Sequence, residues 1–258
     1  ATTRRKPVVL IKSGRSKSGA QAASSHTGAL AGSDAAVDEL FRVCGIQRAA
    51  SIRQLFAAAQ AFEFGKPSRG PRMAIYSNAG GYAVMAADRL ELFAHDRAGL
   101  NLARFSDATE AKLAGLLSPL ATHRNPIDVT AAGPADNPGG YQDGLRAVLA
   151  DDGVDSVLVA VVPLLSLHIP DVARLVAEVA QETDKPVCFM VSAPEHVLAE
   201  ARQAIADAGL APLPIVDSVE DALEGLGALE RFRQWQATPP SVPASVEGAD
   251  RAAVERLI

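Results

Sequence analysis

The chain of 258 residues is 48% hydrophobic and carries a formal net charge of −5, with a pI near 5.6 and a mean hydropathy of +0.09. It is long enough to bury a sizeable core in one large domain or two small ones. The acidic balance and the lack of a basic stripe argue against a nucleic-acid surface. Without a bilayer-length apolar run or a signal-peptide core, the sequence predicts a cytoplasmic chain that binds no membrane.

Cysteine and histidine spacing gives no sign of a metal site. The two cysteines, Cys44 and Cys188, lie far apart and have no other ligand at metal spacing, so neither a disulfide framework nor a zinc site is expected. Four of the five histidines also lack a ligand-like spacing and are expected to be surface or loop residues: His95, His123, His168 and His196.

The first unit of the chain runs from Val8 to about Phe64. The apolar run 8–11 predicts a strand covered on both faces. A helix is predicted by apolar residues at helical spacing and a C-terminal glycine, namely Val37, Leu40, Phe41, Cys44 and Gly45. After a short extended piece at Ile46, the run 51–54 predicts a capping box for a helix with one apolar face: Leu55, Phe56, Ala59 and Phe62. One strand and a short extended piece cannot cover the apolar faces of two helices, so further strands are expected elsewhere.

Between the first strand and the first helix lies a histidine in a loop of small and hydroxylated residues, Ser24–Asp34. Imidazole is nucleophilic near neutral pH because its ordinary pKa is about 6.5. Gly28 and Gly32 allow close backbone approach, hydroxyls are available from Ser25, Thr27 and Ser33, and a helix beginning near residue 33 or 34 would direct free N–H groups at an anion. The pattern suits a phosphoryl-accepting His26, although an ordinary loop with an exposed histidine explains the composition as well.

The breaker-rich segment 65–71 predicts a domain junction. Beyond it, strands and helices alternate. Strands are expected at 73–76, 100–103, 156–162, 187–191 and 213–215, and helices carrying residues 84–90, 106–117, 141–149, 171–183, 195–208 and 219–235. The strand at 156–162 is apolar on both faces and must be central. Five strands with intervening helices predict a flavodoxin-like, doubly wound parallel α/β sheet.

Two turns of this second unit are candidates for a ligand site. Asn78, Gly80 and Gly81 follow the first strand of the sheet, where open α/β sheets bind ligands, although glycines there also simply permit a tight turn. No G-x-G-x-x-G run is present, so a dinucleotide site is not predicted. In the run 125–128, Asn125-Pro126 favours a turn that Asp128 caps or closes.

Three segments, in this order, resemble landmarks of the NDP-forming acyl-CoA synthetases, the ADP-forming acetate–CoA ligase family related to succinyl-CoA synthetase: 6–15 with 25–34, then 77–81, then 125–128. The resemblance extends over nearly the whole chain. It implies that His26 is the phosphorylated catalytic residue. It also implies a set of phosphate-binding residues and two residues near the ligand crevice: Ser25, Thr27, Gly28, Asn78, Gly80 and Gly81, then Asn125 and Asp128.

The resemblance further implies a domain organisation. Residues 1–66 correspond to the later part of a flavodoxin-like domain with the phosphohistidine loop, 67–236 to a complete flavodoxin-like domain, and 237–258 to a linker and the start of an ATP-grasp domain. A CoA-binding domain is expected upstream, in the same chain or another subunit of an oligomer. The acidic residue that orients the phosphohistidine and a further phosphate-binding helix start would then precede Ala1.

The implied activity is that of an acid–CoA ligase. Acyl-CoA, phosphate and ADP would interconvert with a carboxylic acid, CoA and ATP through an acyl phosphate and a phosphohistidine at His26. CoA, ADP or ATP, and magnesium would be bound mainly by other parts of the enzyme. The acyl group of the small carboxylic acid is not set by these residues.

Two other interpretations stand beside this one. The chain could be a catalytically silent, ligand-sensing region of a fused regulatory protein such as a lysine acetyltransferase, against which the presence of His26 argues. A plain flavodoxin-like module for FMN or a partner protein leaves the histidine segment unexplained. One departure from the family leaves the role of a residue open, because Tyr82-Ala83 stands where the family often has Pro-Gly.

Overall fold

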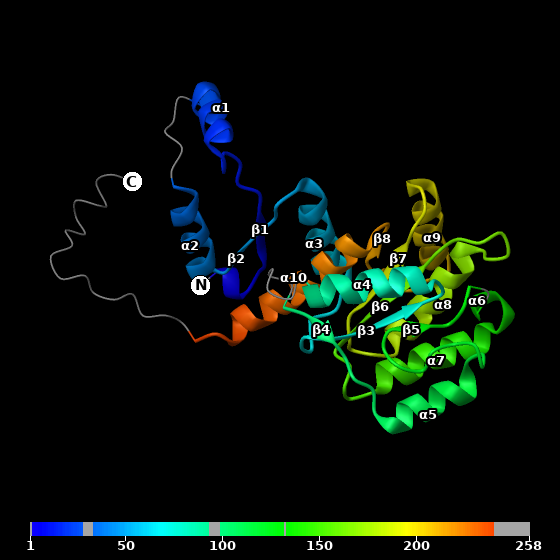
Figure 1. The fold of residues 1–258 in the computed structure, drawn as a ribbon. Helices are drawn as coiled ribbons and strands as arrows, with labels where there is room; N and C mark the ends of the chain where they lie inside the picture. The colour runs from blue at the N-terminus through cyan, green and yellow to red at the C-terminus, as the bar shows by residue number, and fades with distance from the viewer. Residues whose placement is uncertain (1, 28–32, 93–98, 132, 240–258) are drawn as a thin grey trace.

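The computed structural model describes residues 2–27, 33–92, 99–131 and 133–239. Their strands form two parallel sheets, one of two strands and one of six. Figure 1 shows the two-stranded sheet beside one end of the larger α/β layer structure. Among the described residues, no helix combines the length and apolar character needed to cross a bilayer.

The two-stranded sheet and its helices occupy the first part of the chain. The elements are a 3₁₀ helix η1 (Thr2–Arg4), strands β1 (Val8–Leu10) and β2 (Ile46–Arg48), and helices α1 (Lys17–Thr27), α2 (Asp34–Cys44) and α3 (Ile52–Phe64). Helix α2 begins where the Ser33 hydroxyl accepts from the Ala36 N–H, and it ends at Gly45, which is left-handed with φ 66°. The Ser51 hydroxyl likewise caps α3.

Two expectations for this part were wrong, and a third was right only in part. Residues 24–27, predicted as the start of a loop over Ser24–Asp34, instead form the end of helix α1, whose weakly amphipathic composition carries no apolar stripe. Strand β1 is not covered on both faces, since Leu10 is 41% exposed. Helix α3 buries Ala57, Ala58 and Ala61. Of the predicted apolar face, Phe62 packs partly buried against the core, whereas Phe56 is 59% exposed. Small residues face inward there because α3 packs closely on α10, with Gly225 against the Ala57 carbonyl.

The larger sheet contains the remaining strands, and helices cover both of its faces. The strands are β3 (Arg72–Ser77), β4 (Asn101–Leu102), β5 (Ile127–Asp128), β6 (Ser156–Val161), β7 (Val187–Val191) and β8 (Ile215–Val216). The helices are α4 (Gly80–Leu92), α5 (Asp107–Leu116), α6 (Gly133–Asp136), α7 (Pro138–Ala150), α8 (Ile169–Gln181), α9 (Glu195–Asp207) and α10 (Val219–Ala237).

The strand order is β4-β3-β6-β7-β8, with β5 also paired to β3. This is the flavodoxin-like, doubly wound order predicted from the sequence. Strand β5 and helix α6 were not predicted, because elements of two and four residues are too short to show a period. Strand β4 pairs with Arg72 and Met73 at the start of β3, and β5 pairs with Tyr76 and Ser77 at its end.

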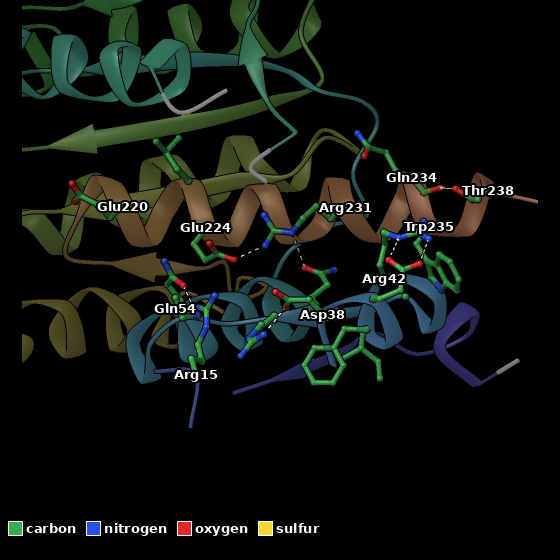
Figure 2. A pocket seen from close by; sticks show the side chains of 18 of the residues that line it. Arg15, Asp38, Arg42, Gln54, Glu220, Glu224, Arg231, Gln234, Trp235 and Thr238 are labelled. Carbon is green, nitrogen blue, oxygen red and sulfur yellow. Dashed lines mark hydrogen bonds and ion pairs between the residues drawn. The ribbon is translucent and has the colours of Figure 1, made fainter. Parts of the chain in front are cut away.

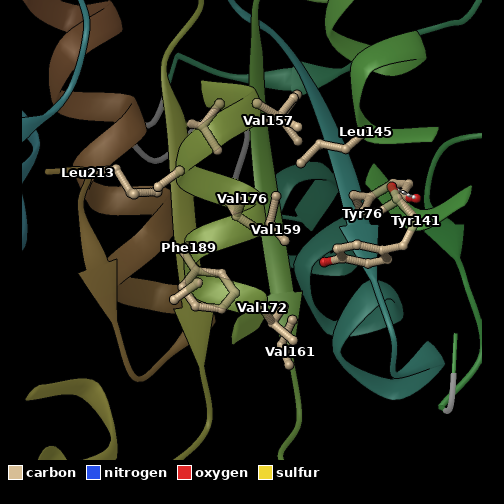
Figure 3. Packing of buried hydrophobic residues seen from close by; sticks show 14 of the residues in the cluster. Tyr76, Tyr141, Leu145, Val157, Val159, Val161, Val172, Val176, Phe189 and Leu213 are labelled. Atoms are coloured by element: carbon tan, nitrogen blue, oxygen red, sulfur yellow. Dashed lines mark hydrogen bonds between the residues drawn. The ribbon is translucent and has the colours of Figure 1, made fainter. Parts of the chain in front are cut away.

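The core lies on both faces of the larger sheet. On one face, α5, α7, α8 and α9 pack against side chains that include Tyr76, Val159 and Phe189. Figure 3 shows part of this cluster, with side chains of α7 and α8 against the strands. On the other face, α4 and α10 pack against Met73 and Leu158. Strand β6 is buried along its whole length, which confirms that it is central.

Helix α10 joins the two parts of the molecule. Besides packing on α3, it accepts a hydrogen bond at the Ala228 carbonyl from Gln47 Nε2 at 2.9 Å. The Trp235 ring lies directly against Gly45, where a Cβ atom would come within 2.0 Å of the indole. The Arg4 guanidinium covers the same indole, 4.6 Å from the ring centroid. Gly45 is therefore required by its neighbour as well as by its backbone conformation.

Candidate active site

The carboxyl edge of the six-stranded sheet contains a topological switch point. Strands β3 and β6 are neighbours, but β3 leads to α4 on one face and β6 leads to α8 on the other. Open parallel sheets bind ligands in the crevice that such a reversal creates. The start of α4 at Gly80 and the end of β5 at Asp128 both lie at this edge.

Asn78 holds the two switch-point strands together. Its Nδ2 donates to the carbonyls of Val162 (3.1 Å) and Ala131 (3.3 Å), and its Oδ1 accepts from the Val162 N–H at 2.8 Å. The residue is only 2% exposed. The sequence predicted a phosphate ligand here, but the side-chain amide is used in internal bonds, so its geometry is that of a positioning residue.

Gly80 and Asp128 are in close contact at the start of α4. A Cβ atom on Gly80 would lie 2.6 Å from Asp128 Oδ2, so the carboxylate needs a glycine beside it. The other oxygen of Asp128, Oδ1, accepts from the Thr130 N–H at 2.9 Å. A carboxylate at a helix N-terminus is favourable because that end of the helix is positive. Asp128 therefore lies at the same sheet edge as the start of α4 and supplies one negative charge there.

The first turn of α4 also offers unused donors. Within the described part of the chain, the N–H groups of Gly80 and Gly81 have no acceptor, whereas that of Tyr82 reaches the Ala79 carbonyl at 3.1 Å. Gly81 is exposed, with no atom within 4 Å of its would-be Cβ. Two free amides at a helix N-terminus suit an oxyanion such as phosphate. No group of metal-ligating side chains is found among the described residues.

Asn125 lies in the sheet, away from the crevice in which the resemblance placed it. Its Oδ1 accepts from the Ile75 N–H at 2.9 Å, and its Nδ2 donates to the carbonyls of Met73 (2.9 Å) and Ala103 (3.0 Å). The side chain thus continues the ladder along β3 between the pairings of β4 and β5. Its amide satisfies backbone groups that would otherwise be unpaired, and it is not a ligand-facing residue.

A tyrosine spans the crevice on the α4 side. Tyr82 lies in the first turn of α4, and its hydroxyl donates to Ser192 Oγ, just beyond β7, at 2.6 Å. Strand β6 lies between β3 and β7, so this side chain passes over the carboxyl end of β6. The sequence marked Tyr82 as a departure from the family pattern but gave no sign of Ser192, since the two residues are 110 positions apart.

The predicted histidine segment lies elsewhere. Ser25, His26 and Thr27 form the end of α1, and Gly28 lies outside the described residues, as do the side chains of His26 and Thr27. The Ser25 hydroxyl donates back to the Gln21 carbonyl at 3.0 Å. Figure 1 shows α1 projecting away from both sheets, at the opposite end of the molecule from the carboxyl ends of β3 and β6. The structure does not bring His26 and the α4 N-terminus together.

Charged groups close the base of this projecting segment. Asp34 at the start of α2 receives Arg48 at 2.6 Å, Arg15 at 3.3 Å and Lys12 at 3.9 Å. Hydrogen bonding from Arg48 is the main cause that lowers the pKa of Asp34. The Arg48 side chain is 3% exposed and also binds Asp38. These pairs tie both ends of residues 15–34 to β2.

A cleft of about 990 Å³ lies between the α2–β2 region and α10, as Figure 2 shows. Its charged side chains are paired across short distances, as Arg42 is with Glu39 and Arg231 is with Glu224. None of the predicted site residues lines it. Because its arginines already hold carboxylates, the cleft offers less to an anion than the open amides of α4.

Comparison with known proteins identifies this architecture. The sequence model of the succinyl-CoA ligase like flavodoxin domain matches residues 1–62. The acetate–CoA ligase (ADP-forming) I subunit alpha of Pyrococcus furiosus is 32% identical, over 91% of this chain and 48% of the relative. The corresponding II subunit alpha of the same organism is 33% identical, over 88% of this chain and 48% of the relative.

A solved structure agrees. Dinucleotide forming acetyl-coenzyme A synthetase 1 of Candidatus Korarchaeum cryptofilum, in complex with phosphate and ADP, superposes with a TM-score of 0.77 at 29% identity. The match covers 91% of this chain and 48% of that chain.

Residues 1–62 therefore match the succinyl-CoA ligase like flavodoxin domain. The chain as a whole is a homologue of the alpha subunits of ADP-forming acetate–CoA ligases and spans about half their length. The family resemblance of the three sequence landmarks is confirmed.

Proposed function

We propose that the chain is the part of an ADP-forming acid–CoA ligase that carries the phosphoryl group on His26. The observation that carries this proposal is the match to two ADP-forming acetate–CoA ligase alpha subunits over 91% and 88% of the chain. In the proposed reaction, phosphate attacks an acyl-CoA to give an acyl phosphate and free CoA. The phosphoryl group then passes to His26 and from there to ADP, leaving the carboxylic acid and ATP.

The switch-point crevice suits one step of this sequence. The free amides of Gly80 and Gly81 can hold phosphate or phosphoryl oxygens without side chains in the way. Asn78 keeps the strand ends beneath them in place. Figure 1 shows that the end of α1, which contains His26, lies far from the switch-point crevice. The transfer therefore requires movement of the histidine segment, or a crevice supplied by another copy or subunit.

Other parts of the full enzyme complete the proposal. We place CoA, the nucleotide and magnesium on an upstream CoA-binding domain and a downstream ATP-grasp domain, in the same chain or a separate subunit of a cytoplasmic oligomer. The domain limits proposed from the sequence are 1–66, 67–236 and 237–258. Names of relatives that include an acetate ligase and a 4-hydroxybutyrate ligase support a small carboxylic acid as substrate.

The regulatory alternative is less well supported. The relatives described above are named as ligases or synthetases. A ligand-sensing region would not need a histidine on a projecting helix, and a simple flavodoxin-like module would not need one either.

The test is phosphorylation of the full protein, with its nucleotide-binding part, by γ-labelled ATP. Wild type should gain acid-labile, base-stable label, and His26→Ala should lose it completely because no other side chain accepts the group. His196→Ala, which removes an exposed histidine on α9, is the matched control and should label like wild type. Undiminished label in His26→Ala would rule out the proposed role.

A further inference from the structure

We propose that Tyr82, through its hydrogen bond to Ser192, is the positioning residue that fixes the first turn of α4 and so aims the Gly80 and Gly81 amides. The structural part of this proposal stands on the described contacts alone. Its consequence for phosphate rests on the proposed function.

Helix α4 has no capping side chain on the residue that directly precedes it. Ala79 precedes the helix and has no side-chain oxygen to cap it, and the next two residues are glycines. Glycine loses more conformational freedom on folding than any other residue, so this turn is intrinsically prone to fray. Helices α5 and α10 start with a capping hydroxyl, from Ser106 and Ser218, whereas α8 and α9, like α4, have no side-chain cap.

Tyr82 supplies the missing anchor. It is the first large side chain of the helix, it is partly buried against the α4–α10 side of the core, and its hydroxyl reaches Ser192 Oγ at 2.6 Å. Ser192 is itself fixed, because its N–H donates to the Val161 carbonyl at 3.2 Å. The first turn of α4 is thereby tied to the ends of β6 and β7, across the switch point.

The position of the anchor explains why it acts on the amides. Tyr82 directly follows Gly81, and its own N–H is bonded to the Ala79 carbonyl at 3.1 Å. Any rotation of the first turn that moved the glycine amides would carry the Tyr82 ring with it and break the bond to Ser192. Tyr82 therefore restrains the direction of donors that it does not itself contribute.

The experiment compares Tyr82→Phe with Tyr76→Phe in the full protein. Tyr76 is a matched control, because its hydroxyl also makes one hydrogen bond, to the Tyr141 carbonyl at 2.8 Å, but it does so inside the opposite core. Amide hydrogen exchange at the hydrogen-bonded residues 82–86 should speed up by about threefold to tenfold in Tyr82→Phe, the worth of one hydrogen bond. In Tyr76→Phe, the amide exchange of the same residues should match that of wild type.

Ser192 variants provide the second arm. Ser192→Ala should reproduce the exchange of Tyr82→Phe, the double variant should be no faster than either single one, and Ser192→Thr should restore slow exchange because it keeps the acceptor hydroxyl. Additive effects in the double variant, or exchange in Tyr82→Phe equal to that of wild type, would overturn the positioning role.

The third arm measures phosphate use. In the direction that consumes inorganic phosphate, Tyr82→Phe should raise KM for phosphate by about threefold to tenfold while kcat changes less than about twofold. Tyr76→Phe should leave both unchanged. If wild type shows no phosphate-dependent activity, the proposed function fails while the exchange comparison still decides the role of Tyr82. If wild type is active and KM does not move, the proposed aim of the amides at phosphate is wrong.

Discussion

Strands β1 and β6 have similar sequences and opposite surroundings. Both are short apolar runs rich in valine and leucine, Val8–Leu10 and Ser156–Val161. Every residue of β6 is buried between two strands and two helical layers, whereas β1 pairs, within the described part of the chain, only with β2 and leaves Leu10 41% exposed. The same pattern therefore gives a core strand in one sheet and a half-covered strand in the other.

The difference teaches that a continuous apolar pattern shows that a strand is suited to burial on both faces, but it does not show whether the strand is buried in this chain. Strand β6 has β3 and β7 on its two sides. Strand β1 has one neighbour among the described residues, and further apolar side chains of the same part, Val43 and Phe56, are exposed as well. Burial energy should thus be concentrated in the six-stranded sheet.

The contrast between β6 and β1 would be wrong if the same leucine-to-alanine truncation lowered the free energy of unfolding equally in the two strands. Leu158→Ala in β6 removes a side chain that is 0% exposed and should lower the free energy of unfolding by about 2–5 kcal/mol. Leu10→Ala in β1 is the matched change and should cost about 0.5 kcal/mol or less in this chain. Urea unfolding of both variants measures the difference, and equal midpoints would show that β1 is covered.

A second prediction concerns the polar link within the larger sheet. Asn78→Ala leaves the Val162 N–H and two carbonyls without partners and should cost about 1–3 kcal/mol. Asn101→Ala, at an exposed position of β4, should change stability by about 0.5 kcal/mol or less. Thermal unfolding of the pair tests whether the switch point depends on one side chain, and a harmless Asn78→Ala would contradict that.

A third prediction uses the two glycines that begin α4. Gly80→Ala places a methyl group against Asp128 Oδ2 and should destabilise the protein by about 1–3 kcal/mol. Gly81→Ala meets no atom within 4 Å and should be neutral or stabilise by up to about 1 kcal/mol, since alanine favours helix. The order of the two melting temperatures is the readout, and the reverse order would refute the close contact with Asp128.

The smallest effect is expected from pH. Hydrogen bonds from Arg72 lower the pKa of Asp155 in the six-stranded part. Its contribution to stability is complete above the unfolded pKa of about 3.9 and is lost as pH falls toward the lowered folded value. Asp155→Asn should therefore flatten the acid limb of a plot of unfolding free energy against pH, by less than one proton. An unchanged slope would show that the carboxylate titrates normally.

The sequence by itself determined the class of the fold and most of its elements. The continuous apolar run of β6, the capping serines 51 and 106, and the glycine after α2 are local signals that depend on backbone sterics and periodicity. Asp128, Gly80 and Gly81, which the family landmarks singled out, lie at one sheet edge, since the carboxyl ends of parallel strands share that edge.

Only the tertiary structure decided what the amide side chains do and where the histidine segment lies. Asn78 and Asn125 read as ligand residues in the sequence, but both satisfy backbone groups of strands far away in the chain, a requirement that no local pattern reveals. The contact of Tyr82 with Ser192 spans 110 positions. The segment that holds α1 is flanked by Arg15 and Asp34, which form a long-range ion pair with each other, and Asp34 also pairs with Arg48. Hydrogen bonds between distant segments form only once the sheet is assembled, so they are decided by topology.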